Sequence, residues 1–327
     1  MEGRPSRPIA LEIAYGGETV HALVTGGAGF IGSHLVEALI ERGHSVRVLD
    51  DLFSGDQNNL NSSVDSVIAS VANQDAVRAA VESCDTVFHL GAHRAVLRSV
   101  EDPLATDLAN VHGTLTVLAA AHDVGVRRVV CASSSSVYGG PEQLPTPETA
   151  PLVPRSPYAV SKLAGEHYCR VYTELLGLET VSLRYFNVYG PRQRPDSAYA
   201  AVIPLFIDAL RNGQPPIVHG DGFQSRDFTF VADAVAATIA AATAPAEKCA
   251  GHVYNVAPGE THSLVELLEI LGRLIGVEPE PKHTSERPGD VRQTCAVPSA
   301  ARRDLGFSCQ IGFEEGLRRT VEWFANR

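Results

Sequence analysis

The stretch from His21 to Ile40 constrains the fold more than any other part of the chain. An apolar run, His21–Thr25, leads into a glycine-rich turn, Gly26–Gly32, and then into an amphipathic segment, Ser33–Ile40. This order predicts a buried strand, a tight turn and a helix. Glycines in such a turn let backbone N–H groups approach a pyrophosphate at the helix N-terminus. The turn is therefore predicted to bind a dinucleotide, with contacts from Gly26, Gly29, Phe30, Ile31 and Gly32.

An acidic residue ends the next apolar run and discriminates between dinucleotides. The run Ser45–Asp50 places Asp50 18 residues after Gly32. A carboxylate at this strand end accepts hydrogen bonds from a ribose 2′-hydroxyl and repels a 2′-phosphate. The expected cofactor is therefore NAD and not NADP.

A tyrosine and a lysine predict proton transfer. Tyr158 and Lys162 are four residues apart, so they lie on one face if the segment is helical. An ammonium group nearby favours the phenolate form of a tyrosine. A phenolate can take the proton of a substrate hydroxyl while a hydride leaves the same carbon. Ser156 is expected to cap this helix and Pro157 to occupy its first position, which places Tyr158 in the first turn.

Alternating strand and helix patterns predict the fold class, an α/β Rossmann-type doubly wound parallel sheet with a smaller mixed α/β substrate lobe. Strands are expected near His21–Thr25, Ser45–Asp50, Asp65–Ala69, Thr86–Leu90, Arg128–Ala132, Thr180–Tyr185 and His252–Val256. Helices are expected near Gly32–Arg42, Gln74–Ser83, Ala105–Val124, Pro157–Leu176 and Val231–Ala242. The predicted domains are an N-terminal extension (1–19), an NAD-binding domain (20–186 and 230–257) and a substrate-binding lobe (187–229 and 258–327).

Composition excludes several classes of protein. Charged residues make up 20% of the 327 residues and the mean hydropathy is near zero, which is typical of a globular chain. The net charge of −11 argues against nonspecific nucleic-acid binding. No stretch resembles a membrane span or a secretory signal, and the six cysteines include no C-x-x-C pair. We therefore expect a cytoplasmic protein with reduced thiols and without a membrane partner. We also expect no metal, because His89 and His93 straddle a strand end and their spacing does not bring them together there.

Together these motifs resemble the extended short-chain dehydrogenase/reductase family, and within it the NAD-dependent nucleotide-sugar 4-epimerases. The resemblance runs from about His21 to Phe324, nearly the whole chain. Its landmarks are Thr25–Gly32, Val87–Ala92, Asn110–Thr114, Ser133–Gly139, Tyr158–Lys162, Arg184–Arg192, Gly220–Asp227 and Arg287–Asp290.

The resemblance implies an isomerase that oxidises C4 of a UDP-hexose and reduces it again through a 4-keto intermediate, with NAD held between turnovers. Its catalytic residues would be Ser134, Tyr158 and Lys162, Ser134 lying four residues before the tyrosine of the Val-Tyr-Gly block. Besides the glycine turn and Asp50, the implied cofactor contacts are Leu90, Ala92, Arg94, Asn110, Tyr158, Lys162 and Tyr185. Ser70 stands where relatives carry an aspartate that contacts the adenine.

The two residues after Ser134 distinguish epimerisation from related reactions of the family. Family members that dehydrate the sugar carry an Asp-Glu pair before Val-Tyr-Gly, and the decarboxylases keep a glutamate there. This chain has Ser135 and Ser136, which are poor acids and bases. The departure favours epimerisation over 4,6-dehydration or decarboxylation. A reductase that consumes NADPH is disfavoured by Asp50, and a non-catalytic dinucleotide sensor by the presence of Tyr158 and Lys162.

The substrate contacts are also implied by the resemblance. They are Ser134, Tyr158, Asn187, Val202, Arg226, Arg287, Asp290 and Thr294. A planar guanidinium can bind two phosphate oxygens at once, which suits Arg226 and Arg287 to a diphosphate. Thr294 is small where hexose-restricted epimerases have tyrosine, and Ser197–Pro204 resembles the N-acetylhexosamine enzymes. We expect activity on UDP-GlcNAc/UDP-GalNAc and UDP-Glc/UDP-Gal. The alternative substrate is UDP-glucuronic acid or a modified nucleotide sugar.

The resemblance also implies a homodimer, which would form through the helices expected at Ala105–Val124 and Pro157–Leu176.

Overall fold

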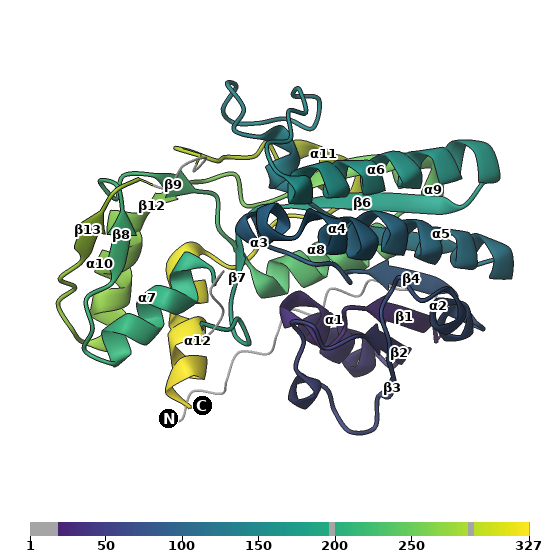
Figure 1. Ribbon diagram of the computed structural model, residues 1–327, viewed down its shortest axis with the longest axis horizontal. Coiled ribbons are helices and arrows are strands. Elements are labelled where there is room, and N and C mark those ends of the chain that lie inside the picture. The colour runs from purple at the N-terminus through teal and green to yellow at the C-terminus, as the bar shows by residue number, and fades with distance from the viewer. Residues whose placement is uncertain (1–18, 196–199, 287–290, 327) are drawn as a thin grey trace, which may run out of the picture.

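The computed structural model describes residues 19–195, 200–286 and 291–326. At its centre is a parallel sheet of seven strands (Figure 1). In order across the sheet these are β3 (Asp65–Ile68), β2 (Ser45–Asp50), β1 (His21–Thr25), β4 (Thr86–His89), β5 (Arg128–Ser134), β6 (Glu179–Tyr185) and β11 (His252–Val256). All seven predicted strands are confirmed, with ends that differ by at most two residues.

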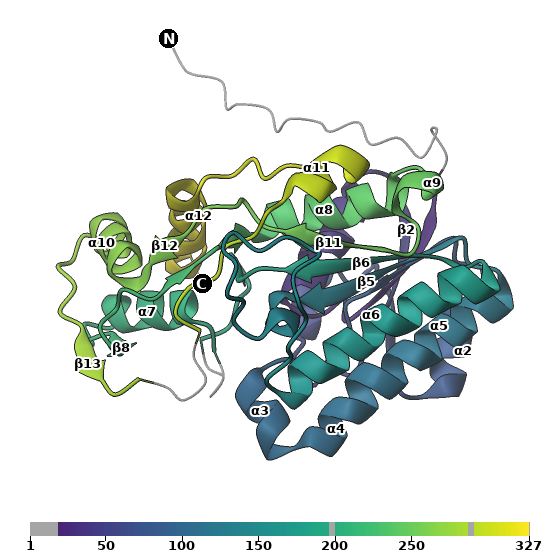
Figure 2. The same ribbon diagram turned by 90° about the horizontal axis from the view of Figure 1, so that it is seen from above.

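Side chains alternate between the two faces of the sheet, as strand geometry requires. Ala22 and Val24 of β1 pack with Leu35 on one face, and Leu23 packs with Val77 on the other. The first face is covered by α1 (Phe30–Glu41), α8 (Val231–Thr243), α9 (Ala246–Cys249) and α11 (Ser299–Leu305). The second is covered by α2 (Gln74–Val81), α5 (Gly113–Val124) and α6 (Pro157–Leu176) (Figure 2). The predicted doubly wound fold is therefore confirmed.

The helix expected at Ala105–Val124 contains a distortion. It consists of α4 (Pro103–Asp107), a π-helical turn η2 (Leu108–His112) and α5, and it is preceded by α3 (Val96–Glu101). A π-turn inserts an extra residue and is found frequently at functional sites. Asn110 lies within it.

The strand order reverses direction at β1, which has β2 on one side and β4 on the other. Connections leave the carboxyl ends of β1 and β4 in opposite directions and so open a crevice there, where open α/β sheets bind ligands. Two short 3₁₀ turns follow strands at this edge, η1 (Gln57–Asn59) after β2 and η3 (Ser135–Tyr138) after β5.

A smaller lobe lies beside the sheet (Figure 1). Its strand pairs are β7 (Val188–Tyr189) with β10 (Thr229–Phe230), β8 (Ile217–His219) with β13 (Lys282–Thr284), and β9 (Ser225–Arg226) with β12 (His262–Ser263). Its helices are α7 (Val202–Arg211), α10 (Leu264–Ile275) and α12 (Phe313–Ala325). They enclose a second core that includes Ile207, Leu267 and Leu317. Apart from Phe230 of β10, these elements come from the two segments predicted for the substrate lobe. In contrast, α11, from the same segments, packs on β11 and on α8, which covers the sheet.

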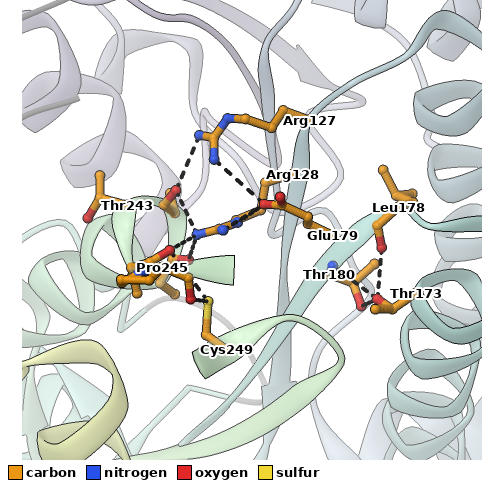
Figure 3. A network of polar contacts seen from close by, with 12 residues as sticks. Arg127, Arg128, Thr173, Leu178, Glu179, Thr180, Thr243, Pro245 and Cys249 are labelled. Carbon is orange, nitrogen blue, oxygen red and sulfur yellow. Dashed lines mark hydrogen bonds and ion pairs between the residues drawn. The ribbon is translucent and has the colours of Figure 1, made fainter. Parts of the chain in front are cut away.

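A buried arginine anchors the edge of the sheet opposite the crevice (Figure 3). The Arg128 side chain is 1% exposed and pairs with Glu179 across 2.6 Å. Its guanidinium also donates to the carbonyls of Ala241, Ala242 and Ala244 at the end of α8. A cation there satisfies the last carbonyls of the helix and complements its dipole.

No helix in the described ranges is long and apolar enough to span a membrane. Over the same residues, no group of three or more histidine, cysteine, aspartate or glutamate side chains is placed to hold a metal ion.

Candidate active site

One cavity of about 680 Å³ occupies the crevice at the carboxyl ends of the strands and extends to the smaller lobe. It gathers residues from the glycine turn, from the ends of β2, β4, β5 and β6, and from α6. Most of the predicted site residues line it: Gly26, Gly29, Phe30, Ile31, Gly32, Asp50, Leu90, Ala92, Arg94, Ser134, Tyr158, Lys162, Tyr185, Asn187, Arg226 and Thr294. Residues that are distant in the sequence therefore meet in one cavity.

The remaining predicted residues lie elsewhere. Val202 lines an adjoining cavity of about 310 Å³, which shares Asn187 and Arg226 with the first. Asn110 is 2% exposed and lies behind the cavity wall. Arg287 and Asp290 fall outside the described residues, as does part of the Ser197–Pro204 block.

The glycine turn packs too closely for larger residues. Gly26 has φ +70°, and a Cβ there would lie 2.7 Å from the Gly91 nitrogen. A Cβ on Gly32 would lie 2.1 Å from the Gly26 carbonyl oxygen. Glycine at these positions lets the turn fold tightly against the loop after β4, and Gly29 precedes α1 as its N-cap. The turn thus presents backbone N–H groups of a helix N-terminus to the cavity, which fits a dinucleotide pyrophosphate.

Asp50 joins the turn to the end of β2. One carboxylate oxygen accepts from the Ala28 N–H at 2.9 Å and the other from the Leu52 N–H at 2.8 Å. Burial raises the pKa of Asp50, and these two backbone bonds oppose the rise. The carboxylate faces the cavity from the strand end where a ribose-binding acid is expected, so its chemistry fits NAD.

Two stacked aromatic rings line the cavity: Phe53, which sequence reasoning overlooked, and His93, which it considered only as a metal ligand. The rings of Phe53 and His93 have centroids 3.8 Å apart at an interplanar angle of 15°. The Arg98 guanidinium lies 4.6 Å from the Phe53 centroid, in cation–π range. The stack connects the loop after β2 with the loop after β4, and both rings line the cavity. The only local signal was the position of Phe53, three residues after Asp50.

Ser70 makes a local contact instead of facing the cavity. Its hydroxyl oxygen accepts from the Ala72 N–H at 3.3 Å, while its neighbours Ala69 and Val71 line the cavity. This hydroxyl belongs to a short turn between β3 and α2, a common arrangement for serine.

Helix α6 presents the tyrosine and the lysine as predicted. The Ser156 hydroxyl accepts from the Ala159 N–H at 3.1 Å and Pro157 occupies the first turn, which confirms the expected cap. Tyr158 and Lys162 both line the cavity. The Lys162 ammonium donates to the Ala132 carbonyl on β5 at 2.9 Å, and this leaves two of its three N–H groups for other acceptors.

Arg94 enters the cavity from the loop after β4. Water reaches this side chain, but the cavity walls displace much of the bulk solvent around it. Its pKa is accordingly lowered by desolvation, and the opposing effect of Tyr158 places the two groups within electrostatic range. Asn110 fixes the same loop: its amide accepts from His93 N at 2.7 Å and donates to His93 O and to the Ser161 hydroxyl. Asn110 therefore holds the Arg94 loop against α6.

Ser134 is the last residue of β5. Its hydroxyl oxygen accepts from the Ser136 N–H at 3.2 Å and so caps the 3₁₀ turn η3. Because the oxygen is the acceptor in this bond, the O–H proton can be donated into the cavity. Ser134 can therefore cap the 3₁₀ turn and donate a hydrogen bond into the cavity at the same time.

Asn187, Thr294 and Asp227 form the boundary with the smaller lobe. Asn187 has φ +33°, uncommon for a residue other than glycine, and its amide donates to Thr294 Oγ1 and to the Asp227 carbonyl, each at 3.2 Å. The buried Asp227 carboxylate accepts from Ala296 N and Gly259 N. Burial raises the pKa of Asp227 to about 7, and these N–H groups oppose the rise.

Comparisons with known proteins agree with this geometry. A UDP-glucose 4-epimerase of Mycolicibacterium smegmatis is 41% identical over 315 residues, which cover 94% of this chain and 99% of the relative. A Thermotoga maritima UDP-glucose 4-epimerase structure with UDP-glucose has a TM-score of 0.90 at 34% identity, covering 94% of this chain and 99% of that one. A UDP-N-acetylglucosamine 4-epimerase of Methanobrevibacter ruminantium, in complex with UDP-N-acetylmuramic acid, has a TM-score of 0.89 at 38% identity, covering 94% and 99%.

The strand–turn–helix dinucleotide motif, the acid at the end of β2 and the tyrosine–lysine pair on α6 all fall within one matched region. Residues 22–257 match the NAD dependent epimerase/dehydratase family, and the chain belongs to this family.

Proposed function

We propose that this chain is an NAD-dependent 4-epimerase of UDP-hexoses that acts on UDP-GlcNAc/UDP-GalNAc and on UDP-Glc/UDP-Gal. The observation that carries the proposal is the common cavity of Ser134, Tyr158 and Lys162 with the glycine turn and Asp50. It brings a proton acceptor and a hydroxyl donor to the site where the turn would hold NAD. The similarity to two UDP-sugar 4-epimerase structures supports the same reaction.

The chain's own residues would act on the C4 hydroxyl. Tyr158, as phenolate, takes the hydroxyl proton, and Ser134 hydrogen-bonds the same oxygen and helps to pass the proton. Lys162 supports the phenolate by its charge and has N–H groups left for a ribose of the cofactor. Bound NAD would supply a two-electron acceptor for the C4 hydride and a donor for its return. The 4-keto sugar would have to turn over in the cavity, because the returning hydride must reach the opposite face of C4. Because no net oxidation occurs, the cofactor can stay bound between turnovers.

The residues before Tyr138 favour epimerisation within a family whose name also covers dehydratases. Ser135 and Ser136 line the cavity where the 4,6-dehydratases have an acidic pair. Loss of water from C5 and C6 needs a further acid and base, and serine hydroxyls ionise far outside the physiological range. The 4-keto sugar would therefore be reduced again and not dehydrated.

The substrate contacts in this proposal come from both lobes. Arg226 would bind the diphosphate together with Arg287, while Asp290 would bind the nucleoside ribose. Val202 would also contact the substrate. Asn187 would contact the diphosphate or the sugar, and the small Thr294 would admit an N-acetyl group. The structural similarity to a UDP-N-acetylglucosamine 4-epimerase supports the last assignment.

A UDP-glucuronic acid 4-epimerase is the second candidate, and one observation favours it. Arg94 and Arg155 line the same cavity as Tyr158, so guanidinium groups are available to a carboxylate on C5. A neutral hexose would offer these guanidinium groups no anion on the sugar.

The proposal also includes a homodimer. Large apolar side chains are exposed along α3, α4, η2 and α6, which pack against one another: Val96, Val100, Leu104, Leu108, Val160 and Leu175. Exposed apolar side chains gathered on neighbouring helices are typical of a protein interface. Leu104, at 81% exposure, is the most exposed of them.

Product analysis tests the proposal. Purified protein is incubated separately with UDP-GlcNAc, UDP-Glc and UDP-glucuronic acid, without added NAD, and the C4 epimers are resolved by NMR. We expect conversion of the first two substrates, and a loss of about 10²- to 10⁴-fold in kcat for Tyr158→Phe, which removes the proton acceptor. Exclusive conversion of the glucuronate would replace the proposed substrate by the second candidate. No conversion of any substrate, also with NAD added, would reject the epimerase.

A further inference from the structure

A buried ion pair lies directly behind the candidate active site. Glu166 on α6 and Arg184 on β6 are joined by two hydrogen bonds, Nε to Oε1 at 2.8 Å and Nη2 to Oε2 at 2.7 Å. Their side chains are 4% and 3% exposed. Because a buried ion pair is costly to desolvate, its presence is only weak evidence that it stabilises the fold. The other contacts of the two side chains indicate what else the pair does.

Glu166 connects the catalytic face of α6 with the end of β5. It follows Lys162 by four residues and Tyr158 by eight, so all three lie on one helix face. Lys162 donates to the Ala132 carbonyl at 2.9 Å, and the next residue of the strand, Ser133, donates its hydroxyl proton to Glu166 at 2.5 Å. Two successive turns of the helix therefore hold two successive residues of the strand. The following strand residue is Ser134, and the preceding helix turn carries Tyr158.

Arg184 holds the other side of Ser134. Its Nη1 donates to the Tyr138 hydroxyl at 2.7 Å, and that hydroxyl donates to Asn255 Oδ1 at 2.7 Å. Tyr138 ends the 3₁₀ turn that the Ser134 hydroxyl caps. Ser134 is thus held between Ser133, bound by Glu166, and Tyr138, bound by Arg184.

We propose that the Glu166–Arg184 pair is a positioning device that sets the placement of the Ser134 hydroxyl relative to Tyr158 for proton transfer. The proposal rests on the proposed epimerase function. Neither charged group lines the cavity, so the pair acts through Ser133 and Tyr138, which do. The two charges connect α6, β5, β6 and η3, the elements that carry or flank the catalytic residues. A small shift between these elements would misalign donor and acceptor without emptying the substrate site.

The test uses hydroxyl variants because removal of either charge would leave the other unpaired in the core. Ser133→Ala removes the contact with Glu166 and Tyr138→Phe removes the contact with Arg184, while the ion pair stays. For each variant, kcat, KM and the thermal unfolding midpoint are measured with the epimerised UDP-sugar. Ser133→Thr keeps a hydroxyl at the same position and serves as the rescue.

Thr180→Val is the matched control. Thr180 also bonds α6 to the sheet through a buried hydroxyl, which donates to the Cys169 carbonyl at 2.8 Å. It lies at the start of β6 beside Thr173, near the end of α6 that is remote from Tyr158 (Figure 3). Loss of this contact is expected to lower the unfolding midpoint and leave kcat unchanged.

The proposal expects kcat to fall by about 10- to 100-fold in Ser133→Ala and Tyr138→Phe, with KM within about twofold of the wild type, because misplaced catalytic groups slow the chemical step. Ser133→Thr should recover most of the rate. An unchanged kcat in the two hydroxyl variants would overturn the proposal, as would an equal loss in Thr180→Val. If the folded wild-type protein itself epimerises no UDP-sugar, the proposed function fails and the positioning role fails with it.

Discussion

The side-chain amide of Asn187 donates to the hydroxyl oxygen of Thr294 across 3.2 Å, at the boundary between the two lobes. The backbone N–H of Asp227 donates to the same oxygen at 3.3 Å. Thr294, proposed to determine the size of the sugar, therefore also orients a proposed substrate contact. A substitution at this position changes both the space in the cavity and the Asn187 amide, and the two effects need separate variants.

The size role of Thr294 is tested by Thr294→Tyr. A phenol ring would fill the space proposed for an N-acetyl group. The kcat/KM for UDP-GlcNAc should therefore fall by at least about 10-fold more than that for UDP-Glc, a change of about 1.4 kcal/mol or more in the relative activation free energy. The measurement is kcat/KM for both substrates. Thr294→Val keeps the size and loses the hydroxyl, so it should reduce both activities equally through Asn187. Equal losses in Thr294→Tyr would remove the size argument.

His89 is expected to make the fold acid-sensitive. Its ring is 3% exposed, with Nδ1 2.8 Å from Thr25 Oγ1 and Nε2 2.9 Å from Thr114 Oγ1. Thr114 donates its own proton to the Asn110 carbonyl, so it accepts from Nε2–H, and the neutral ring accepts from Thr25. Burial lowers the pKa of His89 to about 3, and Lys162 contributes to the shift.

Since the folded-state pKa is below the unfolded value of about 6.5, this stabilisation is complete above that pH and is lost as the pH falls towards 3. We expect the free energy of unfolding to drop by about 2 kcal/mol between pH 7 and pH 5 on account of His89. The measurement is urea unfolding at pH 7 and at pH 5, in which the drop in the free energy of unfolding should be smaller by about 2 kcal/mol in His89→Gln than in the wild type. The same drop in His89→Gln as in the wild type would contradict the assignment.

The stack of Phe53 on His93 is expected to slow the loss of NAD. It joins the loop after β2 to the loop after β4, and both rings line the cavity that holds the glycine turn and Asp50. Phe53→Ala removes the ring, and we expect the NAD dissociation rate to rise by about 10-fold, since a stacked aromatic pair contributes about 0.5–1.5 kcal/mol. Cofactor retained after dialysis is the readout, and Phe53→Tyr, which keeps the ring, should retain NAD like the wild type. Equal retention in the alanine variant would exclude this role.

The proposed dimer interface is tested at Leu104. Leu104→Glu places a charge in the exposed apolar patch on α4, and burying an unpaired carboxylate at an interface is strongly unfavourable. We expect a shift from dimer to monomer in light scattering after gel filtration. Phe223→Glu is the control, because Phe223 is 66% exposed on the smaller lobe, away from the patch. A dimer that persists in Leu104→Glu would place the interface elsewhere.

Local physical chemistry made much of the fold predictable. The side chains of a strand such as β1 alternate between two buried faces, so β1 is a short apolar run in the sequence. The cap and first turn of α6 follow from Ser156 and Pro157. The glycine turn was readable because a Cβ on Gly32 would strike the Gly26 carbonyl only six residues away. These features depend on neighbours in the sequence, so a single chain displays them.

The sequence by itself determined the strand and helix pattern, the dinucleotide turn and the tyrosine–lysine face of α6. Only the tertiary structure decided that Asn110 holds the His93 loop and does not line the cavity, that Phe53 stacks on His93, and that Glu166 and Arg184 flank Ser134. Each of these contacts joins residues on different elements. Their geometry is set by how helices pack on the sheet and how loops close over it, and no local periodicity records that arrangement.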